Sequence, residues 1–397
     1  MNVSSAVDPQ KIFRIFSGGT EVSPFHKCYE NEETILRVCA GRFFVHFNGD
    51  DPVAGYWALR RKAVLVDVPE RPLEISGPDA LPLLERIFAR KISVLKVGRG
   101  YYVVACTHSG GLFMDGILFR PTEDKYWFVQ PDGDMLTWLL AHGRGFDATV
   151  SDPHSRVLQI QGPSSIEIMR IATNGAIDSN MLFFRCGYFE IGGQTLFVSR
   201  TGWTGELGFE IYTLGERTDC PRLWDYLVKI GTPKGLMFSS MQSINTRRIE
   251  AGILDSGSDF DMSMTPFEAG LEKFVDLEKD GYIGRDALMN AARGKRLFGL
   301  YCSGIVPSRN FQVFDGSDLV GIVTTGAWSP YLQAGIGYVR FFSAGDWPGK
   351  ILTMHSDDFG SADCKIVDPP FYDREKNIPR GRTPTGGANP LLRVALP

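Results

Sequence analysis

The stretch that decides the fold is Ser199-Arg200-Thr201-Gly202-Trp203-Thr204-Gly205-Glu206-Leu207-Gly208-Phe209-Glu210-Ile211. Three glycines within seven residues let the backbone approach a ligand closely, because glycine has no side chain. Trp203 offers a flat aromatic face to a heteroaromatic ring or to a cationic methyl group. Glu210 can present a carboxylate to the N–H groups of a ring. The alternative that the residues leave open is a tight hairpin with Trp203 in its core.

Strand-like segments lie on both sides of this stretch. Short apolar and β-branched runs alternate with turns rich in glycine, proline and aspartate, a pattern that predicts antiparallel strands. The expected strands are residues 101–106, 114–119, 125–130, 188–191, 194–199 and 209–212.

A strand followed by Gly-Pro and a helix occurs twice. The first unit follows a strand at 64–66 and comprises strand 73–75, Gly77-Pro78-Asp79 and helix 80–89; the second comprises strand 157–161, Gly162-Pro163-Ser164 and helix 166–171. Proline sets φ for the first helical turn, and we expect the aspartate or serine side chain to cap the helix. Two such units predict an α+β body with internal pseudo-symmetry.

The character of the sequence changes after a helix expected at 285–292. Short strands such as 321–325 and 335–339 then alternate with glycine and proline turns, which predicts a separate small β-barrel or sandwich. We therefore divide the chain into a body of two intertwined α+β subdomains (1–290), a β-barrel domain (291–379) and a flexible tail (380–397). The first fifty residues are irregular and difficult to place.

Composition excludes several classes of protein. A net charge of -4 offers no basic excess for binding nucleic acid. No apolar run approaches the roughly 20 residues that cross a bilayer, and the N-terminus has no signal-peptide core. The seven cysteines and six histidines are scattered without metal-ligand spacing. We expect a cytoplasmic monomer or homodimer with no metal, no membrane partner and no nucleic-acid partner.

A second motif places one carboxylate inside an apolar strand. Asp115 follows Gly110-Gly111 within the sequence Gly-Gly-Leu-Phe-Met-Asp-Gly-Ile-Leu-Phe. Burial would raise the pKa of this carboxyl group, so that it could share a proton near neutral pH. The alternative is an aspartate that faces solvent from an edge strand or caps the turn.

A third region has a structural explanation when taken alone. Arg247 to Ile253 predicts a helix in which Arg248 and Glu250 belong to an ion-pair network. A loop follows, and residues 265–274 predict a second capped helix.

In combination, these motifs resemble those of the glycine-cleavage T-protein (aminomethyltransferase) superfamily. Arg-Thr-Gly-Trp-Thr-Gly-Glu-x-Gly-Phe-Glu-Ile resembles its signature, in which tyrosine usually stands at the position of Trp203. Arg-Ile-Glu-Ala-Gly-Ile, Pro-Phe-Glu-Ala-Gly-Leu and the segment from Gly321 to Pro330 resemble later blocks in the same order. The resemblance implies a folate-binding body of antiparallel sheets with helices, followed by a C-terminal β-barrel.

Several details resemble dimethylsulfoniopropionate demethylase and related tetrahydrofolate-dependent demethylases more closely. Trp203 replaces tyrosine, Pro131-Asp132-Gly133-Asp134 resembles their acidic turn, and Trp328 precedes Ser-Pro. Ser256-Gly257-Ser258-Asp259 also resembles the demethylase version.

Two departures separate the chain from the T-protein itself. Met114 stands where the T-protein has the first of two paired aspartates. Ser243-Ile244-Asn245 replaces Ala-Arg-Asp, so the arginine that contacts the pterin is missing.

The resemblance also implies roles for individual residues. Glu210 is expected to hold the pterin ring of tetrahydrofolate, and Asp115 to lie near folate N5 as the catalytic residue. The remaining candidates are Trp203, Glu206 and Trp328 for the cofactor, and Trp203, Tyr102 and Asp132 for the substrate.

The expected function is transfer of a methyl group to folate N5 from a small methylated donor: a sulfonium such as dimethylsulfoniopropionate, a betaine or a methoxy compound. One alternative is a T-protein-like aminomethyltransferase that forms 5,10-methylenetetrahydrofolate. Another is a non-catalytic folate-binding regulator, a class that centres on a reactive cysteine motif. Thr218-Asp219-Cys220-Pro221 lacks that motif.

Overall fold

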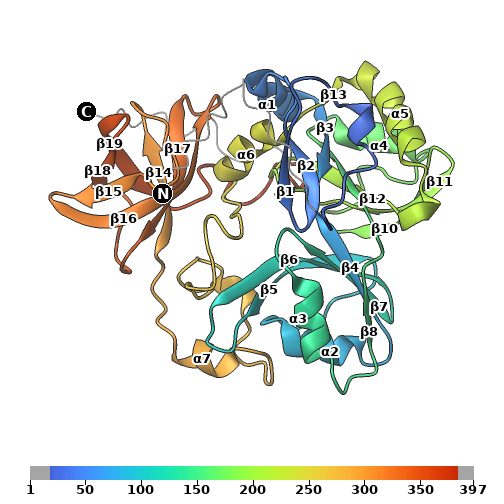
Figure 1. Cartoon of the computed structure of the whole chain (residues 1–397), viewed down its shortest axis with the longest axis horizontal. Coiled ribbons are helices and arrows are strands. Elements are labelled where there is room, and N and C mark those ends of the chain that lie inside the picture. The colour runs from blue at the N-terminus through green and yellow to red at the C-terminus, as the bar shows by residue number, and fades with distance from the viewer. Residues whose placement is uncertain (1–17, 383–397) are drawn as a thin grey trace.

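The computed structural model describes residues 18–382 and contains two large sheets and a two-stranded sheet in the body, with a barrel beside them (Figure 1). The six-stranded sheet has the order β10-β11-β12-β9-β3-β13, and only the pair β13–β3 is parallel within it. Its strands are β3 (Ala63–Val68), β9 (Val157–Gln161), β10 (Cys186–Ile191), β11 (Gln194–Ser199), β12 (Gly208–Tyr212) and β13 (Leu236–Phe238).

The five-stranded sheet is antiparallel and has the order β5-β6-β7-β4-β8. Its strands are β4 (Arg71–Ser76), β5 (Arg99–Cys106), β6 (Leu112–Thr122), β7 (Lys125–Gln130) and β8 (Thr149–Ser151). The chain therefore leaves the six-stranded sheet after β3, completes the five-stranded sheet, and returns at β9.

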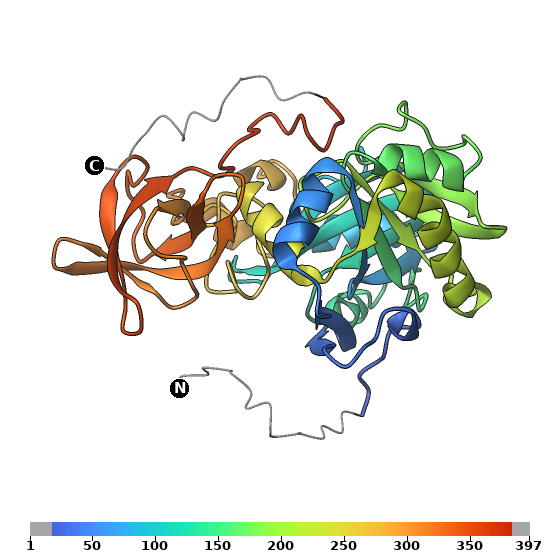
Figure 2. The same ribbon diagram turned by 90° about the horizontal axis from the view of Figure 1, so that it is seen from above.

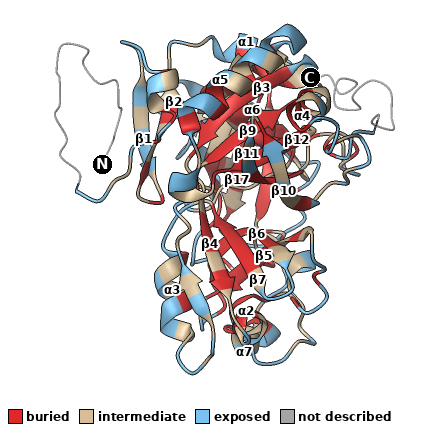
Figure 3. Cartoon of the chain, turned by 90° about the vertical axis from the view of Figure 1, so that its right-hand side faces the viewer, coloured by how far each residue is buried: buried red, intermediate tan, exposed pale blue. Residues whose placement is uncertain are grey.

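Helices cover both sheets because their apolar sides are buried against them. On α2, Leu83, Leu84 and Ile87 are fully buried in the core of the five-stranded sheet. The helices α4 and α5 pack on the six-stranded sheet, and Figure 3 shows the buried strands beneath them. The helices are α1 (Pro52–Arg61), α2 (Ala80–Ile87), α3 (Met135–His142), α4 (Ser165–Ala172), α5 (Cys220–Gly231), α6 (Met241–Glu250) and α7 (Arg285–Asn290), with short 3₁₀ turns η1 (His26–Cys28), η2 (Gly215–Arg217), η3 (Thr232–Lys234) and η4 (Glu272–Phe274).

The repeated strand–Gly-Pro–helix unit is present as β4–α2 and as β9–α4, one copy in each sheet. The predicted side-chain caps are wrong, because neither Asp79 nor Ser164 bonds to its helix through its side chain. Asp79 instead accepts a hydrogen bond from the N–H of Asp147 at 2.8 Å, which ties α2 to a distant loop. The first helix ends before Ala89 because Phe88 is extended and the N–H of Ala89 bonds to Val104 in β5.

Two regions differ from expectation. The irregular N-terminal segment contains a hairpin, β1 (Ile35–Cys39) with β2 (Arg42–Phe47). The second helix expected at 265–274 is wrong: the segment forms turns and ends in the 3₁₀ turn η4. Thr265 and Glu268 still cap each other, but Gly270 adopts a left-handed φ of 74°, which ends the helical turn.

The predicted barrel is confirmed as a closed six-stranded barrel of order β14-β17-β16-β15-β18-β19. Its strands are β14 (Leu297–Cys302), β15 (Gln312–Asp315), β16 (Asp318–Ser329), β17 (Ala334–Phe341), β18 (Ile351–Ser356) and β19 (Gly360–Val367). Together the barrel and the mixed body confirm the α+β fold class.

After the barrel, the chain runs back over the body (Figure 2). The N–H of Phe371 donates to the carbonyl of Glu250 at 3.0 Å, and the Lys376 ammonium donates to the carbonyl of Ala251. Most of the predicted flexible tail lies outside the described residues. Within residues 18–382, no helix combines the length and hydropathy that a membrane span requires.

Candidate functional site

A cavity of about 690 Å³ lies where the body, the N-terminal hairpin and the barrel meet. Its wall comes from β1 and β2, from α1 and α6, from the β3–β4 turn, and from β16 of the barrel. Three of the predicted site residues line this cavity: Trp203, Trp328 and Asp132.

The two tryptophans come from different parts of the fold. Trp203 lies in the loop between β11 and β12, and the guanidinium of Arg248 stands 5.2 Å from the centre of its ring. Trp328 extends from β16 and is 42% exposed. Arg248 therefore covers one side of Trp203, while the barrel contributes the second aromatic ring.

Asp132 holds the N-terminal hairpin in place. Its Oδ1 accepts hydrogen bonds from the N–H of Ala40 at 2.8 Å and of Gly133 at 2.7 Å. Ala40 lies in the tight turn between β1 and β2, so Asp132 connects that turn to the cavity wall.

Glu210 lies behind the cavity wall and does not line the cavity. Its carboxylate accepts hydrogen bonds from Thr201 Oγ1 at 2.5 Å, Tyr212 Oη at 2.7 Å and Gln159 Nε2 at 2.9 Å. Burial raises the pKa of Glu210, whereas these hydrogen bonds lower it. Glu210 is therefore connected to the cavity lining by its hydrogen bond with Gln159, which lines the cavity.

Glu70 and Gln159, which do line the cavity, were missed from the sequence. Gln159 Nε2 lies 3.4 Å from Glu70 Oε1, and the remaining oxygens, Glu70 Oε2 and Gln159 Oε1, are buried with no partner among residues 18–382. Burial and the nearby Glu210 raise the pKa of Glu70 well above its ordinary value. The available signal was a carboxylate in a two-residue turn between two short apolar strands, β3 and β4.

Asp115 and Tyr102 form a pair on the neighbouring strands β6 and β5. Tyr102 Oη donates to Asp115 Oδ2 at 2.7 Å, and Asp115 Oδ1 is buried with no partner among the described residues. Burial, with a smaller contribution from the carboxylate of Asp255, raises the pKa of Asp115 to about 6, although the hydrogen bond from Tyr102 lowers it. The alternative of an aspartate on an edge strand is wrong, because β6 lies between β5 and β7.

Neither member of this pair lines the cavity, but Asp255 does. Asp255 is near enough to Asp115 to raise the pKa of its carboxyl group.

Glu206 also lies away from the cavity lining. Its Oε1 lies 2.7 Å from Nη1 of Arg60 and 2.7 Å from Nε of Arg247. The three side chains form a buried ion-pair network between α1 and α6. Arg248 and Glu250 both take part in ion pairs, as predicted, but with different partners: Arg248 pairs with Asp259, and Glu250 lies 3.8 Å from Arg247. The sequence could not distinguish these partners because Asp259 lies in a loop whose path depends on the barrel.

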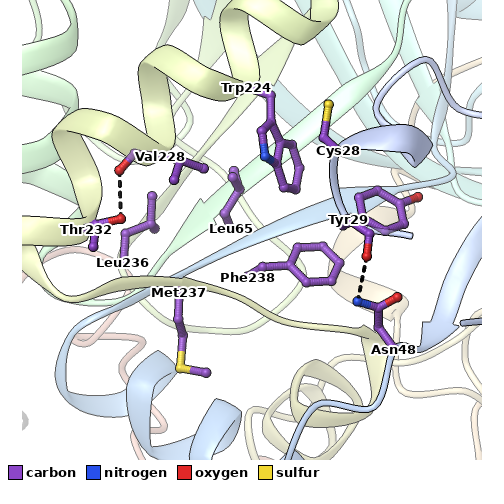
Figure 4. A pocket seen from close by; sticks show the side chains of 10 residues that line it. All are labelled: Cys28, Tyr29, Asn48, Leu65, Trp224, Val228, Thr232, Leu236, Met237 and Phe238. Atoms are coloured by element: carbon purple, nitrogen blue, oxygen red, sulfur yellow. Dashed lines mark hydrogen bonds between the residues drawn. The ribbon is translucent and has the colours of Figure 1, made fainter. Parts of the chain in front are cut away.

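A second cavity of about 310 Å³ lies between α5 and the six-stranded sheet and contains none of the predicted site residues. Trp224, Phe238 and Leu65 surround it, and Asn48 Nδ2 donates to the carbonyl of Tyr29 at 3.0 Å beside it (Figure 4).

One group of metal-type side chains occurs among residues 18–382: Glu21, Asp152 and His154. Arg156 lies 2.6 Å from Glu21, and Arg71 lies 2.6 Å from Asp152. These carboxylates are therefore neutralised by arginines.

Comparison with known proteins places this architecture in a family. Residues 47–279 match the GCVT N-terminal domain, and residues 295–373 match the glycine cleavage T-protein C-terminal barrel domain. The chain belongs to the glycine cleavage T-protein family. The family predicted from the ordered motifs is thus confirmed, whereas the closer relation to demethylases stays a prediction.

Individual relatives agree with this assignment. The aminomethyltransferase of Bacillus pumilus (strain SAFR-032) is 31% identical over 330 residues, which cover 80% of this chain and 90% of the relative. That of Streptomyces avermitilis is 33% identical over 334 residues, covering 80% and 89%. The fold also matches the crystal structure of glycine cleavage system aminomethyltransferase T from Bartonella henselae with a TM-score of 0.80 at 21% identity, covering 88% of this chain and 98% of that one.

Proposed function

We propose that this protein is a tetrahydrofolate-dependent one-carbon transferase that takes a methyl group from a small methylated donor. The observation that supports the folate site is the pair of unpartnered acceptor oxygens on Glu70 and Gln159, two residues that line the cavity. A buried acceptor without a donor costs about 1–3 kcal/mol. A pterin ring, with its amino and ring N–H groups, is a ligand that would satisfy both oxygens.

The electrostatics of Glu70 are consistent with this role. The pKa of its carboxyl group is raised because burial and Glu210 both disfavour the charged form. Hydrogen bonds from a ligand to the carboxylate favour the charged form, so ligand binding should lower this pKa. In this proposal Glu210 orients Gln159, through the 2.9 Å bond to its Nε2, rather than contacting the ring.

The rest of the cavity favours a cationic donor. Trp203 and Trp328 offer aromatic faces, and Asp132 and Asp255 add carboxylates to the same wall. Aromatic faces stabilise a sulfonium or quaternary ammonium group by about 0.5–2 kcal/mol. Ile244 also lines the cavity, where the family resemblance implies the pterin-contacting arginine of the T-protein.

A cationic donor needs little proton transfer, because the group that leaves is neutral. Folate supplies N5 as the acceptor of the one-carbon unit. The protein then contributes chiefly proximity and orientation, which can lower a barrier by roughly 7–11 kcal/mol. An ether donor would need a proton at the leaving oxygen. We assign that role, where it is required, to the pair of Asp115 and Tyr102.

Aminomethyl transfer is the second candidate. The relatives with 31–33% identity over most of the chain are aminomethyltransferases, and this similarity favours a product of 5,10-methylenetetrahydrofolate.

The test is incubation of the protein with tetrahydrofolate and a panel of sulfonium, betaine and methoxy compounds, followed by mass detection of the folate product. 5-Methyltetrahydrofolate supports methyl transfer. 5,10-Methylenetetrahydrofolate formed with an aminomethylated lipoyl carrier supports the second candidate. Folate binding without any product would favour the non-catalytic regulator instead.

A substitution tests the folate site directly. We expect Glu70→Gln to weaken tetrahydrofolate binding at least tenfold, measured by tryptophan fluorescence or calorimetry, because one acceptor oxygen is lost. Glu32→Gln, at an exposed position before β1, is the matched control. Unchanged affinity in Glu70→Gln would contradict the proposed site.

A further inference from the structure

The cavity lining contains basic side chains besides the carboxylates of Glu70, Asp132 and Asp255. Arg37 on β1 and His46 on β2 both line the cavity, and Arg309 lines it from the barrel. Arg37 lies directly opposite Phe44 on the neighbouring strand of the hairpin, and Phe44 also lines the cavity. His46 lies two residues after Phe44 on β2 and lines the cavity as well.

The two arginines have no ion-pair partner within the part of the chain that the structure describes. Among residues 18–382, neither Arg37 nor Arg309 has an acidic group within 4.0 Å or donates a side-chain hydrogen bond, and both are exposed. By contrast, Arg248 on the same wall is paired with Asp259 and also donates to Thr325 Oγ1 at 3.0 Å. Arg37 and Arg309 are therefore available to a ligand.

His46 lies near Arg37 in the hairpin. Burial lowers its pKa, and the neighbouring guanidinium of Arg37 lowers it further.

We propose that Arg37 and Arg309, which line the same cavity, bind a carboxylate of the ligand. The inference rests on the proposed function and adds to it the chemical class of one substrate group. A guanidinium presents paired N–H donors whose spacing matches the two oxygens of a carboxylate. The hairpin supplies one cation and the barrel the other, so the carboxylate is held between two separate parts of the fold.

Two ligands could bring this carboxylate. The first is tetrahydrofolate, through the carboxylates of its glutamate. The second is a small zwitterionic donor that carries a methylated cation at one end and a carboxylate at the other. In the second case, the tryptophans and carboxylates of the cavity would hold the cation while the arginines hold the anion.

The experiment compares matched ligands with and without the carboxylate. Binding of tetrahydrofolate and of tetrahydropteroate, which lacks glutamate, is measured by calorimetry on the full-length protein and on Arg37→Gln, Arg309→Gln and the double variant. Glycine betaine and choline, both trimethylammonium compounds, are then compared in the presence of tetrahydrofolate. Arg61→Gln, an exposed arginine that does not line the cavity, is the control.

We expect the double variant to bind either tetrahydrofolate or glycine betaine at least tenfold more weakly than the wild type does. The matching ligand without the carboxylate, tetrahydropteroate or choline, should bind with unchanged affinity. A loss with tetrahydrofolate alone identifies the glutamate, and a loss with betaine alone identifies the donor. If the wild type binds tetrahydrofolate but the double variant keeps the wild-type affinity for all four ligands, the inference is overturned and the folate site stands. If the wild type binds no tetrahydrofolate, the proposed function fails, and this inference fails with it.

Discussion

Several carboxyl groups are buried in this protein although burial disfavours their ionised form. Asp115, Glu70 and Glu210 all have a pKa raised by burial, so their charged forms are disfavoured in the folded protein. Asp115 keeps one oxygen bonded to Tyr102 and leaves the other without a partner among the described residues. A carboxylate retained at such a cost is a candidate for function, because an amide of the same size would fit without the cost.

At the residue scale we predict that Asp115→Asn stabilises the protein at alkaline pH. The folded pKa of about 6 lies above the unfolded value of 3.8, so folding favours the protonated acid. The penalty for ionisation is absent below about pH 4, grows between pH 4 and 6, and is constant above that range. The asparagine variant avoids it, with a gain of about 3 kcal/mol at pH 8.

Urea unfolding of both proteins at pH 4.5, 6 and 8 measures this difference. Asp286→Asn, at a fully exposed carboxylate, should show no such trend. A gain for Asp115→Asn that is equal at all three pH values would show that ionisation of Asp115 is not its cause. A simultaneous loss of transferase activity would support the chemical role proposed for Asp115.

At the scale of the element, α6 connects the body to the barrel. Arg247, Arg248 and Glu250 are all buried on this helix, although charged residues usually face solvent. Arg248 pairs with Asp259 and donates to Thr325 Oγ1 of β16, while its guanidinium also lies over Trp203. One side chain thus supports both the barrel contact and a wall of the cavity.

We predict that Arg248→Met destabilises the fold by about 3–5 kcal/mol, because it leaves the charge of Asp259 buried without its partner. Adding Asp259→Asn should recover part of this loss. Thermal and urea unfolding measure both effects. Arg170→Met, in an exposed pair with Glu167, should change stability very little. If Arg248→Met behaves like Arg170→Met, the buried pair does not stabilise the junction.

At the scale of the whole molecule, the barrel and the body share one carboxylate. Glu250 accepts hydrogen bonds from Tyr56 of α1 at 2.7 Å, from Ser329 of β16 at 2.6 Å, and from Tyr372 in the segment after the barrel. Three segments that are distant in sequence therefore meet at a single side chain. The larger cavity opens beside this junction, since Tyr56 also lines it.

We predict that Glu250→Ala lowers stability by about 3 kcal/mol or more, because three hydroxyl groups lose their acceptor at once. Calorimetry should show the barrel and the body unfolding in separate transitions in this variant, and in a single transition in the wild type. Glu250→Gln retains an acceptor oxygen and is the control. A single transition at the wild-type temperature for Glu250→Ala would exclude this junction as the link between the two parts.

Much of the fold could be predicted from short-range patterns. The strands at 125–130 and 157–161 were located to the residue, and both strand–Gly-Pro–helix units and the barrel are present. These features depend on the alternation of apolar residues and on turn chemistry within about ten positions, so the local sequence contains the information. The side-chain cap expected for α2 is absent because Asp79 bonds to a distant loop, and α4 forms without the cap expected from Ser164. The helix expected at 265–274 ends early because Gly270 adopts a left-handed φ.

The sequence by itself determined the family and most of the strand segments, because ordered motifs and periodicity are local properties of the chain. Only the tertiary structure decided that Glu70 and Gln159, 89 positions apart, line the cavity while Glu210 lies behind them. It also decided that the N-terminal hairpin and the barrel bring Arg37 and Arg309 to the same cavity. The physical reason is that sheet register and the packing of separate units determine which side chains face the cavity. The spacing of residues along the chain specifies neither.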